Sequence, residues 1–364
     1  MVYTERTRVA TDQAIRPLGK KIFPGILSIL LLVLVVIGLA TAWLAFPWTP
    51  SKSKTLGFEG FIELPTPKLL NILDYLSLHN NVLFVTNENS GSVYRIALPP
   101  DQMPAHAVVA IMTGAPKPHH VALVASGQTA YVTRSETNSV DAFDANELHV
   151  LTAIPVAEGA DSLLYDPESE LIYVANGDSK SATLIDPKER KVVATIPLGA
   201  KPEFQAFDPQ THLLYQNLED TNAVVAIDLR GRRVIEQWAL QQCEAPTGMA
   251  LDDTGRNLFI VCNQNAKLVV FDLVGHRVIA ALPIGGGPDS VVFDPALHRI
   301  YTTGKSGVLT VLAQTDKTHY VVLDNIHTHF GAHTLAVDLN THRVFLGYAS
   351  VIASPRVAVF SVKP

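Results

Sequence analysis

Short runs of alternating apolar and polar residues, separated by turn residues, repeat from about residue 55 to the end of the chain. In the clearest copy, a run that opens at Ala160 ends in Asp166-Pro167, and a second run begins with Tyr173-Val174-Ala175-Asn176. A third run ends in Asp186-Pro187, and Val192–Leu198 forms the fourth. Alternation with a period of two residues, broken by turns about every 8–12 positions, predicts four antiparallel strands per copy.

One aromatic residue in the second strand of each copy gives the number of copies. These aromatics are Phe84, Tyr131, Tyr173, Tyr215, Phe259, Tyr301 and Phe345. Their spacing is 42–47 residues, and aspartates seven residues before the last five of them keep the same phase. Four strands in a repeat of about 40–45 residues are typical of a β-propeller blade. The sequence therefore predicts an all-β fold, a seven-bladed β-propeller with four-stranded antiparallel blades.

The residues of the second strands also resemble a known repeat. Phe84-Val85-Thr86-Asn87, Tyr131-Val132-Thr133-Arg134 and Tyr173-Val174-Ala175-Asn176, with the Asp-Pro turns, are similar to the YVTN-type (YncE-like) propeller repeat. The resemblance covers about residues 57–364, although the last four copies keep the spacing and not the YVTN letters. It implies the propeller fold and, because its members are mostly secreted or surface binding proteins, a binding role with no named ligand.

A long uncharged stretch precedes the repeats. Residues 1–22 are polar and mostly basic, and Ile26–Phe46 has no charged residue, which is long enough for a helix that crosses a bilayer. We expect residues 23–46 to be a transmembrane signal anchor, with the basic tail in the cytoplasm and the propeller on the extracytoplasmic, periplasmic side of the inner membrane. A cleaved signal peptide, with Ala40-Thr41-Ala42 as its site, is the alternative and gives a secreted protein. Residues 47–56 read as a linker.

The first strand after the linker belongs with the last repeat. Residues 57–65 read as a lone strand that aligns with the fourth strands of the other copies, and the copy that starts at His333 supplies only three strands. We therefore expect residues 57–65 to close the last blade and the propeller to span residues 57–364.

The charge of the chain argues against nucleic acid as a partner. Of its 28 basic and 34 acidic residues, five basic and two acidic ones lie in the first 22, which leaves 23 against 32 and a net charge of about −9 for the rest. Binding to phosphates needs lysine and arginine, and no basic run is present. Relatives of the repeat family have been linked to single-stranded DNA, but this composition makes nucleic acid an unlikely partner here.

Two cysteines, Cys243 and Cys262, lie in the fifth copy and lack the spacing of a zinc site. A hairpin that pairs Thr247 near Cys262 brings both cysteines to the same end of one blade. Outside the cytoplasm they can form a disulfide, and the other interpretation is two buried, inert thiols.

The residues that open the inner strands form the candidate binding site. In a propeller, the connection that enters each inner strand lies on the binding face, beside the central channel. Counting twelve residues back from each aromatic predicts a ring of residues at the channel mouth: Ile72, His119, Asp161, Glu203, Thr247, Asp289 and His333. His120 and Phe204 are next to ring members, and Lys201 lies in the loop before Glu203.

Three interpretations of this ring are open. It is a solvated polar rim, a site where carboxylates hold a cationic, polar or peptide ligand, or a metal site. Imidazole and carboxylate suit Zn²⁺, Cu²⁺ or Mn²⁺, and His119, His327, His329 and His333 are the candidate metal ligands. By contrast His212, His298 and His342 stand three residues before an aromatic, so we interpret them as turn residues.

No enzyme motif is present: there is no Gly-x-Ser-x-Gly, phosphate loop or dinucleotide fingerprint, and we assign no catalytic residue. Streptogramin-type lyases are also seven-bladed propellers and use a histidine, an acid and a divalent metal, which His333, His119 and Glu203 could imitate. We expect a binding scaffold for a small ligand or an envelope protein. A metal-dependent lyase-like enzyme or a metal-binding propeller is the alternative.

Overall fold

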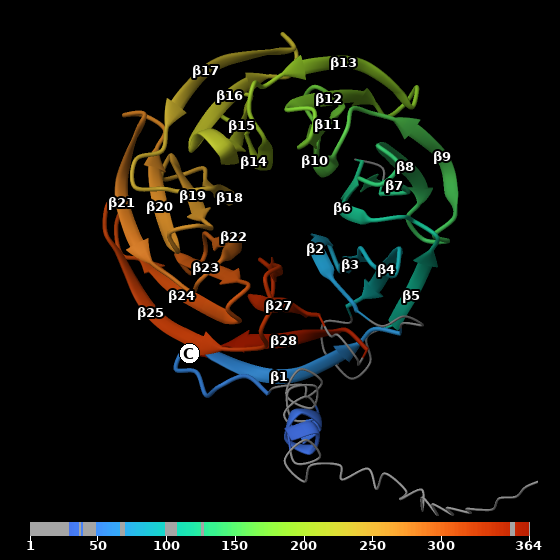
Figure 1. The fold of residues 1–364 in the computed structure, drawn as a ribbon. Coiled ribbons are helices and arrows are strands. Elements are labelled where there is room, and N and C mark those ends of the chain that lie inside the picture. Colours follow the sequence, from blue (N-terminus) through green and yellow to red (C-terminus); the bar gives the residue numbers. More distant parts are fainter. Residues whose placement is uncertain are drawn as a thin grey trace, which may run out of the picture. The chain divides into compact units, whose positions relative to one another are not determined.

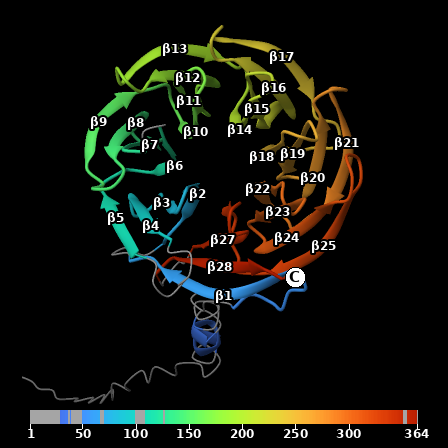
Figure 2. The ribbon, with the colours of Figure 1, turned by 180° about the vertical axis from the view of Figure 1, so that it is seen from behind.

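The computed structural model describes residues 29–35, 38, 49–65, 70–98, 108–124, 127–349 and 354–363. The chain divides into two units, Met1–Leu44 and Ala45–Pro364, and each is described by itself. In the described part of the second unit, 28 strands form seven four-stranded antiparallel sheets around a central axis (Figures 1 and 2). The fold is a seven-bladed β-propeller, as the spacing of the aromatics predicts.

Each blade runs outward from the axis. The inner strands are β2 (Leu73–His79), β6 (Pro118–Leu123), β10 (Ala160–Asp166), β14 (Pro202–Asp208), β18 (Pro246–Asp252), β22 (Pro288–Asp294) and β26 (Leu335–Asp338). The second strands are β3 (Val82–Asn87), β7 (Thr129–Arg134), β11 (Leu171–Asn176), β15 (Leu213–Leu218), β19 (Asn257–Cys262), β23 (Arg299–Gly304) and β27 (Arg343–Tyr348).

The third strands are β4 (Ser92–Ala97), β8 (Ser139–Asp144), β12 (Ser181–Asp186), β16 (Ala223–Asp228), β20 (Lys267–Asp272), β24 (Val308–Gln314) and β28 (Arg356–Val362). The outer strands are β5 (Val108–Thr113), β9 (Val150–Pro155), β13 (Lys191–Pro197), β17 (Arg233–Ala239), β21 (Arg277–Pro283), β25 (Tyr320–His327) and β1 (Leu56–Glu63). A short 3-10 helix, Glu219–Thr221, follows β15.

The aromatic that marks each repeat is part of the core between two blades. All seven are at most 4% exposed. Phe84 of the first blade packs with Val132 and Phe143 of the second, and Phe345 of the seventh packs with Tyr94 of the first. A blade needs this large side chain to bury its face against its neighbour, which explains why the aromatic recurs with the repeat.

The seventh blade is built from both ends of the propeller unit. β1 pairs antiparallel with β28, from Leu56 opposite Val362 to Glu63 opposite Arg356, and so becomes the outer strand of the sheet that contains β26 and β27. This pairing joins the first residues of the unit to the last ones and covers a sheet edge that would otherwise be free.

The turns between first and second strands carry the repeated aspartates. Asp166 accepts hydrogen bonds from the N–H groups of Glu168 and Ser169, both at 3.0 Å. His212, His298 and His342 occupy the left-handed position of such turns, with φ of 59°, 49° and 58°, a conformation in which histidine is enriched. These histidines are turn residues, as predicted.

Some of the turn aspartates also connect neighbouring blades. Asp208 is fully buried and pairs with both terminal nitrogens of Arg256 on the next blade, at 2.5 and 2.8 Å. The Nδ1 atom of His342 lies 2.6 Å from Asp294 of the preceding blade. These contacts hold adjacent blades together at the end of the inner strands that is far from the predicted ring.

Cys243 and Cys262 form a disulfide, with Cα atoms 5.2 Å apart. The residue opposite Cys262 in the ladder is Pro246 and not Thr247. Both cysteines are buried, at 3% and 0% exposure, so the bond ties the loop that enters the fifth blade to that blade's second strand.

Part of the predicted linker is bonded to the propeller. The hydroxyl of Ser53 donates to Asp324 of β25 at 2.7 Å, and the N–H of Ser51 donates to the carbonyl of His327 at 2.8 Å. Within the described residues of the first unit, positions 29–35 and 38 are helical. Within the described ranges, none of the helices combines the length and the hydropathy that a membrane crossing requires. The basic tail and most of the predicted anchor at 23–46 lie outside the described residues.

Candidate functional site at the channel mouth

A repeated irregularity in the inner strands positions the ring. In β6, the ladder to the second strand breaks between Pro118 and Val121, and in β14 it breaks between Pro202 and Gln205. The same break occurs near the start of β2, β10, β18 and β22. Bulges of this kind turn side chains away from the ladder. One or two residues at the start of each of these strands therefore leave the sheet at the channel mouth.

The first blade contributes Asp74 and not the predicted Ile72. Its first hairpin pairs His79 with Val82 across a two-residue turn, whereas the corresponding hairpin of the third blade pairs Asp166 with Leu171 across four residues. A count of twelve residues from Phe84 is therefore two too long. The ring consists of Asp74, His119, Asp161, Glu203, Thr247, Asp289 and His333.

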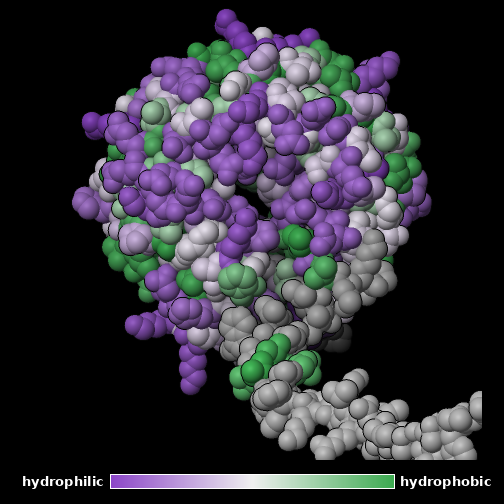
Figure 3. All heavy atoms as spheres, viewed as in Figure 1, coloured by the Kyte–Doolittle hydropathy of each residue, from purple (hydrophilic) through white to green (hydrophobic). Residues whose placement is uncertain are grey.

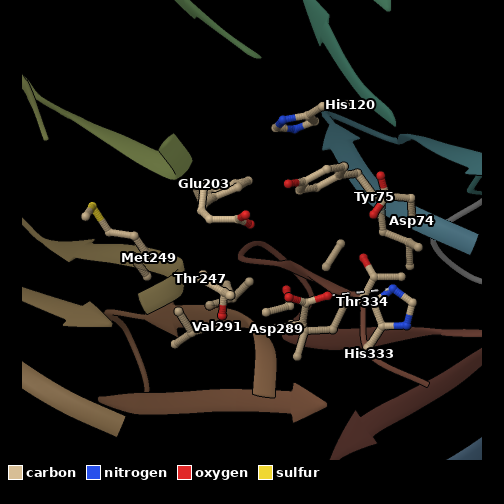
Figure 4. A pocket seen from close by; sticks show the side chains of 18 of the residues that line it. Asp74, Tyr75, His120, Glu203, Thr247, Met249, Asp289, Val291, His333 and Thr334 are labelled. Carbon is tan, nitrogen blue, oxygen red and sulfur yellow. Dashed lines mark ion pairs between the residues drawn. The ribbon is translucent and has the colours of Figure 1, made fainter. Parts of the chain in front are cut away.

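The ring opens into a cavity of about 710 Å³. All eight predicted ligand-binding residues line it: His119, His120, Asp161, Glu203, Phe204, Thr247, Asp289 and His333. Figure 3 shows a hollow at the centre of the propeller, surrounded mostly by hydrophilic residues. In Figure 4 the carboxylates of Glu203 and Asp289 and the hydroxyl of Tyr75 point into the same space.

His119 is the centre of one charged group. Its Nδ1 lies 2.5 Å from Asp74 and 3.6 Å from Asp161, and its Nε2 lies 2.7 Å from the Ser135 hydroxyl. Burial alone would lower the pKa of His119, but the hydrogen bond and charge of Asp74, helped by Asp161, raise this pKa to about 9. His119 is therefore a cation at neutral pH and neutralises one carboxylate of the ring.

Two ring carboxylates hold protons more tightly than usual. Burial raises the pKa of Asp161 to about 7, against the opposing charge of His119. Burial and the charge of Asp161 raise the pKa of Glu203 to about 8, although the ammonium of Lys201 lies 2.6 Å from Glu203. Lys201 is also 2.5 Å from Glu219, so its single charge is shared between two carboxylates.

His333 and Asp289 form a looser pair. The Nδ1–H of His333 donates to the carbonyl of Gly331 at 2.7 Å, which leaves its Nε2 at 3.7 Å from Asp289. That distance is too long for a hydrogen bond. Burial raises the pKa of Asp289. Thr247 differs from the other ring members because its hydroxyl donates to the carbonyl of Pro288 at 3.0 Å and binds the next blade.

Three stacked aromatic rings form one wall of the cavity. The ring centroids of Tyr75 and His120 lie 4.5 Å apart, and Phe204 lies 5.7 Å from Tyr75 and 5.5 Å from His120. The Nδ1 of His120 accepts a hydrogen bond from the N–H of Leu163 at 3.3 Å. Burial lowers the pKa of His120 to about 3, so this imidazole is neutral and behaves as an aromatic side chain.

The predicted four-histidine metal set is not brought together. His327 is exposed on β25, and His329 is buried, with its ring 5.6 Å from that of Tyr348. Neither residue lines the cavity. In the described part of the chain, the group whose donor atoms could share one metal ion is Asp74, Glu88 and His119, all within 4.8 Å of one another. This mixture of oxygen and nitrogen donors fits a divalent transition metal.

Asp74, Tyr75 and Glu88 also line the cavity and were not predicted from the sequence. The dipeptide Asn80-Asn81 could have indicated Asp74 and Tyr75, because it suits a two-residue hairpin turn that shortens the count back from Phe84. Asn80 has a φ of 53° in that turn. Glu88 follows the second strand of the first blade directly, and only the folded chain shows that it reaches the cavity.

Comparison with known proteins adds information on the fold alone. No family model and no curated protein matches this chain. Among solved structures, hydrazine synthase from Kuenenia stuttgartiensis is similar, with a TM-score of 0.54 and 17% identity over 64% of this chain and 76% of that one. At this identity the similarity shows a shared propeller architecture and carries no statement about activity.

Proposed function

We propose that this chain is a YVTN-type propeller, anchored in the cytoplasmic membrane by its N-terminal segment, that binds a cationic ligand at the extracytoplasmic channel mouth. The uncharged stretch Ile26–Phe46 after a basic tail supports the anchor and its orientation. The Cys243–Cys262 disulfide supports an oxidising compartment for the propeller. A chain secreted after cleavage at Ala40-Thr41-Ala42 places the propeller in the same compartment.

The charge inventory of the cavity carries the binding proposal. Six carboxylate residues line it: Asp74, Glu88, Asp161, Glu203, Glu219 and Asp289. The lysines that line it are Lys201 and Lys305, and Lys201 is already paired with two carboxylates. With His119 protonated, six carboxylate groups still face three cationic side chains, so this concave site attracts cations, and a bound cation favours the ionised forms of Asp161 and Glu203 over their protonated ones.

Binding can be tested by thermal shift with the full-length chain in detergent. The probes are spermidine, hexylamine, MnCl₂, ZnCl₂ and sodium hexanoate, and the matched proteins are the wild type, Asp161→Asn/Asp289→Asn and the exposed-carboxylate control Glu236→Gln. We expect at least one cation to raise the melting temperature saturably in the wild type and the control, and not in the double variant. Stabilisation by hexanoate alone, or by no probe, would contradict the proposal.

The Asp74, Glu88 and His119 group favours a second candidate, a metal-dependent or metal-binding propeller. These residues would hold the ion, and the ion would polarise a bound substrate. His333, whose Nε2 lies 3.7 Å from Asp289, is the imidazole that could move a proton. Elemental analysis of the untagged full-length chain beside Glu88→Gln and His119→Gln tests this candidate. A stoichiometric transition metal that both variants lose would support it.

Orientation in the membrane is tested separately. Carbonate extraction of cell membranes should leave the full-length chain in the pellet, and protease added to spheroplasts should digest the propeller without permeabilisation. A propeller that is digested only after lysis would contradict the proposed orientation.

A further inference from the structure

The cavity has different walls on its two sides. At the position that follows the ring residue, the first, second and fourth blades carry Tyr75, His120 and Phe204, and the third carries the buried Ser162. The fifth, sixth and seventh blades carry Gly248, Ser290 and Thr334. The small residues leave room on that side of the channel. Farther along the same inner strands the lining residues are apolar, and Leu251 and Val292 among them are partly exposed. In Figure 4 the strands that carry Met249 and Val291 lie across the cavity from Tyr75 and Asp74.

We propose that the ligand is a primary organic ammonium ion with an apolar body. Its ammonium group lies among the carboxylates of Asp161, Glu203 and Asp289, and its body lies between the aromatic wall and the apolar side chains beyond it. This inference rests on the proposed function, since it names the chemical class of the cation that the channel mouth binds.

The hydrogen-bond inventory explains the ammonium group. Asp161 and Asp289 line the cavity, and among the described residues their closest cationic partners are His119 at 3.6 Å and His333 at 3.7 Å, beyond hydrogen-bond distance. Their oxygens therefore remain available as acceptors. A primary ammonium group has three N–H donors and one positive charge, which suits two free carboxylates and a third, Glu203, that shares its lysine with Glu219.

The walls explain the organic body. A volume of about 710 Å³ is in the range of cavities that enclose drug-sized molecules, and far exceeds the space of a bare ion. Tyr75 and Phe204 offer aromatic surface beside the carboxylates, which attracts a cation, and Leu251 and Val292, both partly exposed, offer apolar surface farther along the channel. A hydrated metal ion would gain nothing from these surfaces.

The alternative at Asp74, Glu88 and His119 requires contacts to break. Both ring nitrogens of His119 already have partners, Asp74 at 2.5 Å and the Ser135 hydroxyl at 2.7 Å. A metal ion would have to replace one of these bonds. The carboxylates of Asp161 and Asp289 need no such exchange to accept an ammonium ion.

Isothermal titration calorimetry of the full-length chain in detergent tests the inference with five probes. Hexylamine and propylamine differ in apolar length, hexyltrimethylammonium keeps the charge without N–H donors, and hexanoate reverses the charge. MnCl₂ is the bare cation. We expect saturable binding of hexylamine. Propylamine has three fewer methylenes, each worth about fourfold in affinity, so it should bind tens-fold more weakly than hexylamine. Hexyltrimethylammonium should bind at least tenfold more weakly than hexylamine, and hexanoate should not bind.

Variants locate the site. Asp161→Asn and Asp289→Asn should each weaken hexylamine binding at least tenfold, Leu251→Ser should weaken it severalfold, and Glu236→Gln should leave it unchanged. Circular dichroism melts show whether each variant is folded. The inference is overturned if hexylamine and hexyltrimethylammonium bind with equal affinity, or if neither asparagine variant changes the affinity for hexylamine. Saturable MnCl₂ binding without hexylamine binding overturns it and leaves the cation-binding function standing, whereas binding of hexanoate alone removes both.

Discussion

The ring carboxylates should make the empty propeller less stable as the pH rises, and Asp161→Asn isolates this effect. Asp161 is an acid whose folded pKa, about 7, lies above its ordinary value of 3.8 because of burial. Between these two pH values the folded chain keeps a proton that the unfolded chain has lost. Stability contributed by this proton is therefore present at low pH and is lost as the pH rises from about 4 to about 7. Asparagine keeps the shape of the protonated acid and does not titrate.

The magnitude follows from the shift. A shift of about three pKa units corresponds to at most about 4 kcal/mol at roughly 1.36 kcal/mol per unit. The Asp161 side chain is 25% exposed, and neighbouring groups adjust their own protonation, so we expect about half of this value, on the order of 2 kcal/mol. At about 2 °C per kcal/mol for a domain of this size, Asp161→Asn should melt several degrees above the wild type at pH 8 and at the same temperature at pH 4.

Thermal melts of the wild type and Asp161→Asn at half-unit steps from pH 4 to pH 8 measure the difference directly. Effects of other titrating groups cancel in this comparison unless they contact Asp161. Glu147→Gln, an exposed carboxylate on the second blade, is the matched control. A variant that is less stable than the wild type at pH 8 would refute the reasoning, because it would mean that the interaction with His119 outweighs burial.

Three further predictions concern the scaffold. Replacing Cys243 and Cys262 by serine should lower the free energy of unfolding by about 3 kcal/mol, from the 19-residue separation of the bridge, and reduction of the wild type should give a similar loss in a denaturant titration. Arg256→Ala should cost about 3–5 kcal/mol, because it leaves the buried carboxylate of Asp208 unpaired, and the double variant with Asp208→Asn should recover part of that loss in the same assay. A chain that starts at residue 66, after β1, should aggregate in size-exclusion chromatography because the edge of β28 is uncovered; a monomer with the wild-type melting temperature would contradict this.

The fold could be predicted because its physical cause repeats. Each second strand needs a large side chain against the next blade, and each Asp-Pro turn needs a carboxylate that accepts backbone N–H groups, so Tyr173 and Asp166 recur in register. The strand that closes the ring could be predicted from the same count, because the last copy lacked a fourth strand. No comparable repeat marks the N-terminal segment, whose prediction rests on its hydropathy and on the basic residues before it.

The ring could be predicted only as far as the hairpins have equal lengths. Asp161 and Asp289 were found because four residues separate the paired ends of their first hairpins. In the first blade the two-residue turn at Asn80-Asn81 moved the predicted position from Asp74 to Ile72. The contacts of His119 with Asp74 and Ser135 join different strands and blades. Sequence spacing does not determine such distances, so the proton positions and free carboxylates of the site required the folded structure.

The backbone of the propeller is repeated, but the side chains at the channel mouth are not, and this difference indicates where specificity lies. The same bulge in six inner strands presents one or two residues per blade to the channel. At the position after the ring residue, Tyr75, Ser162 and Thr334 stand on different blades, so the repeated backbone does not require one particular side chain there. Gly248 is the exception that the scaffold needs, because a Cβ there would lie 2.6 Å from the carbonyl of Asp289. Aromatic rings on three blades and small residues on the other four therefore favour a ligand with a flat or apolar side and a polar, charged head. Exchanging Phe204 and Ser290 should change which ligand binds without changing the fold.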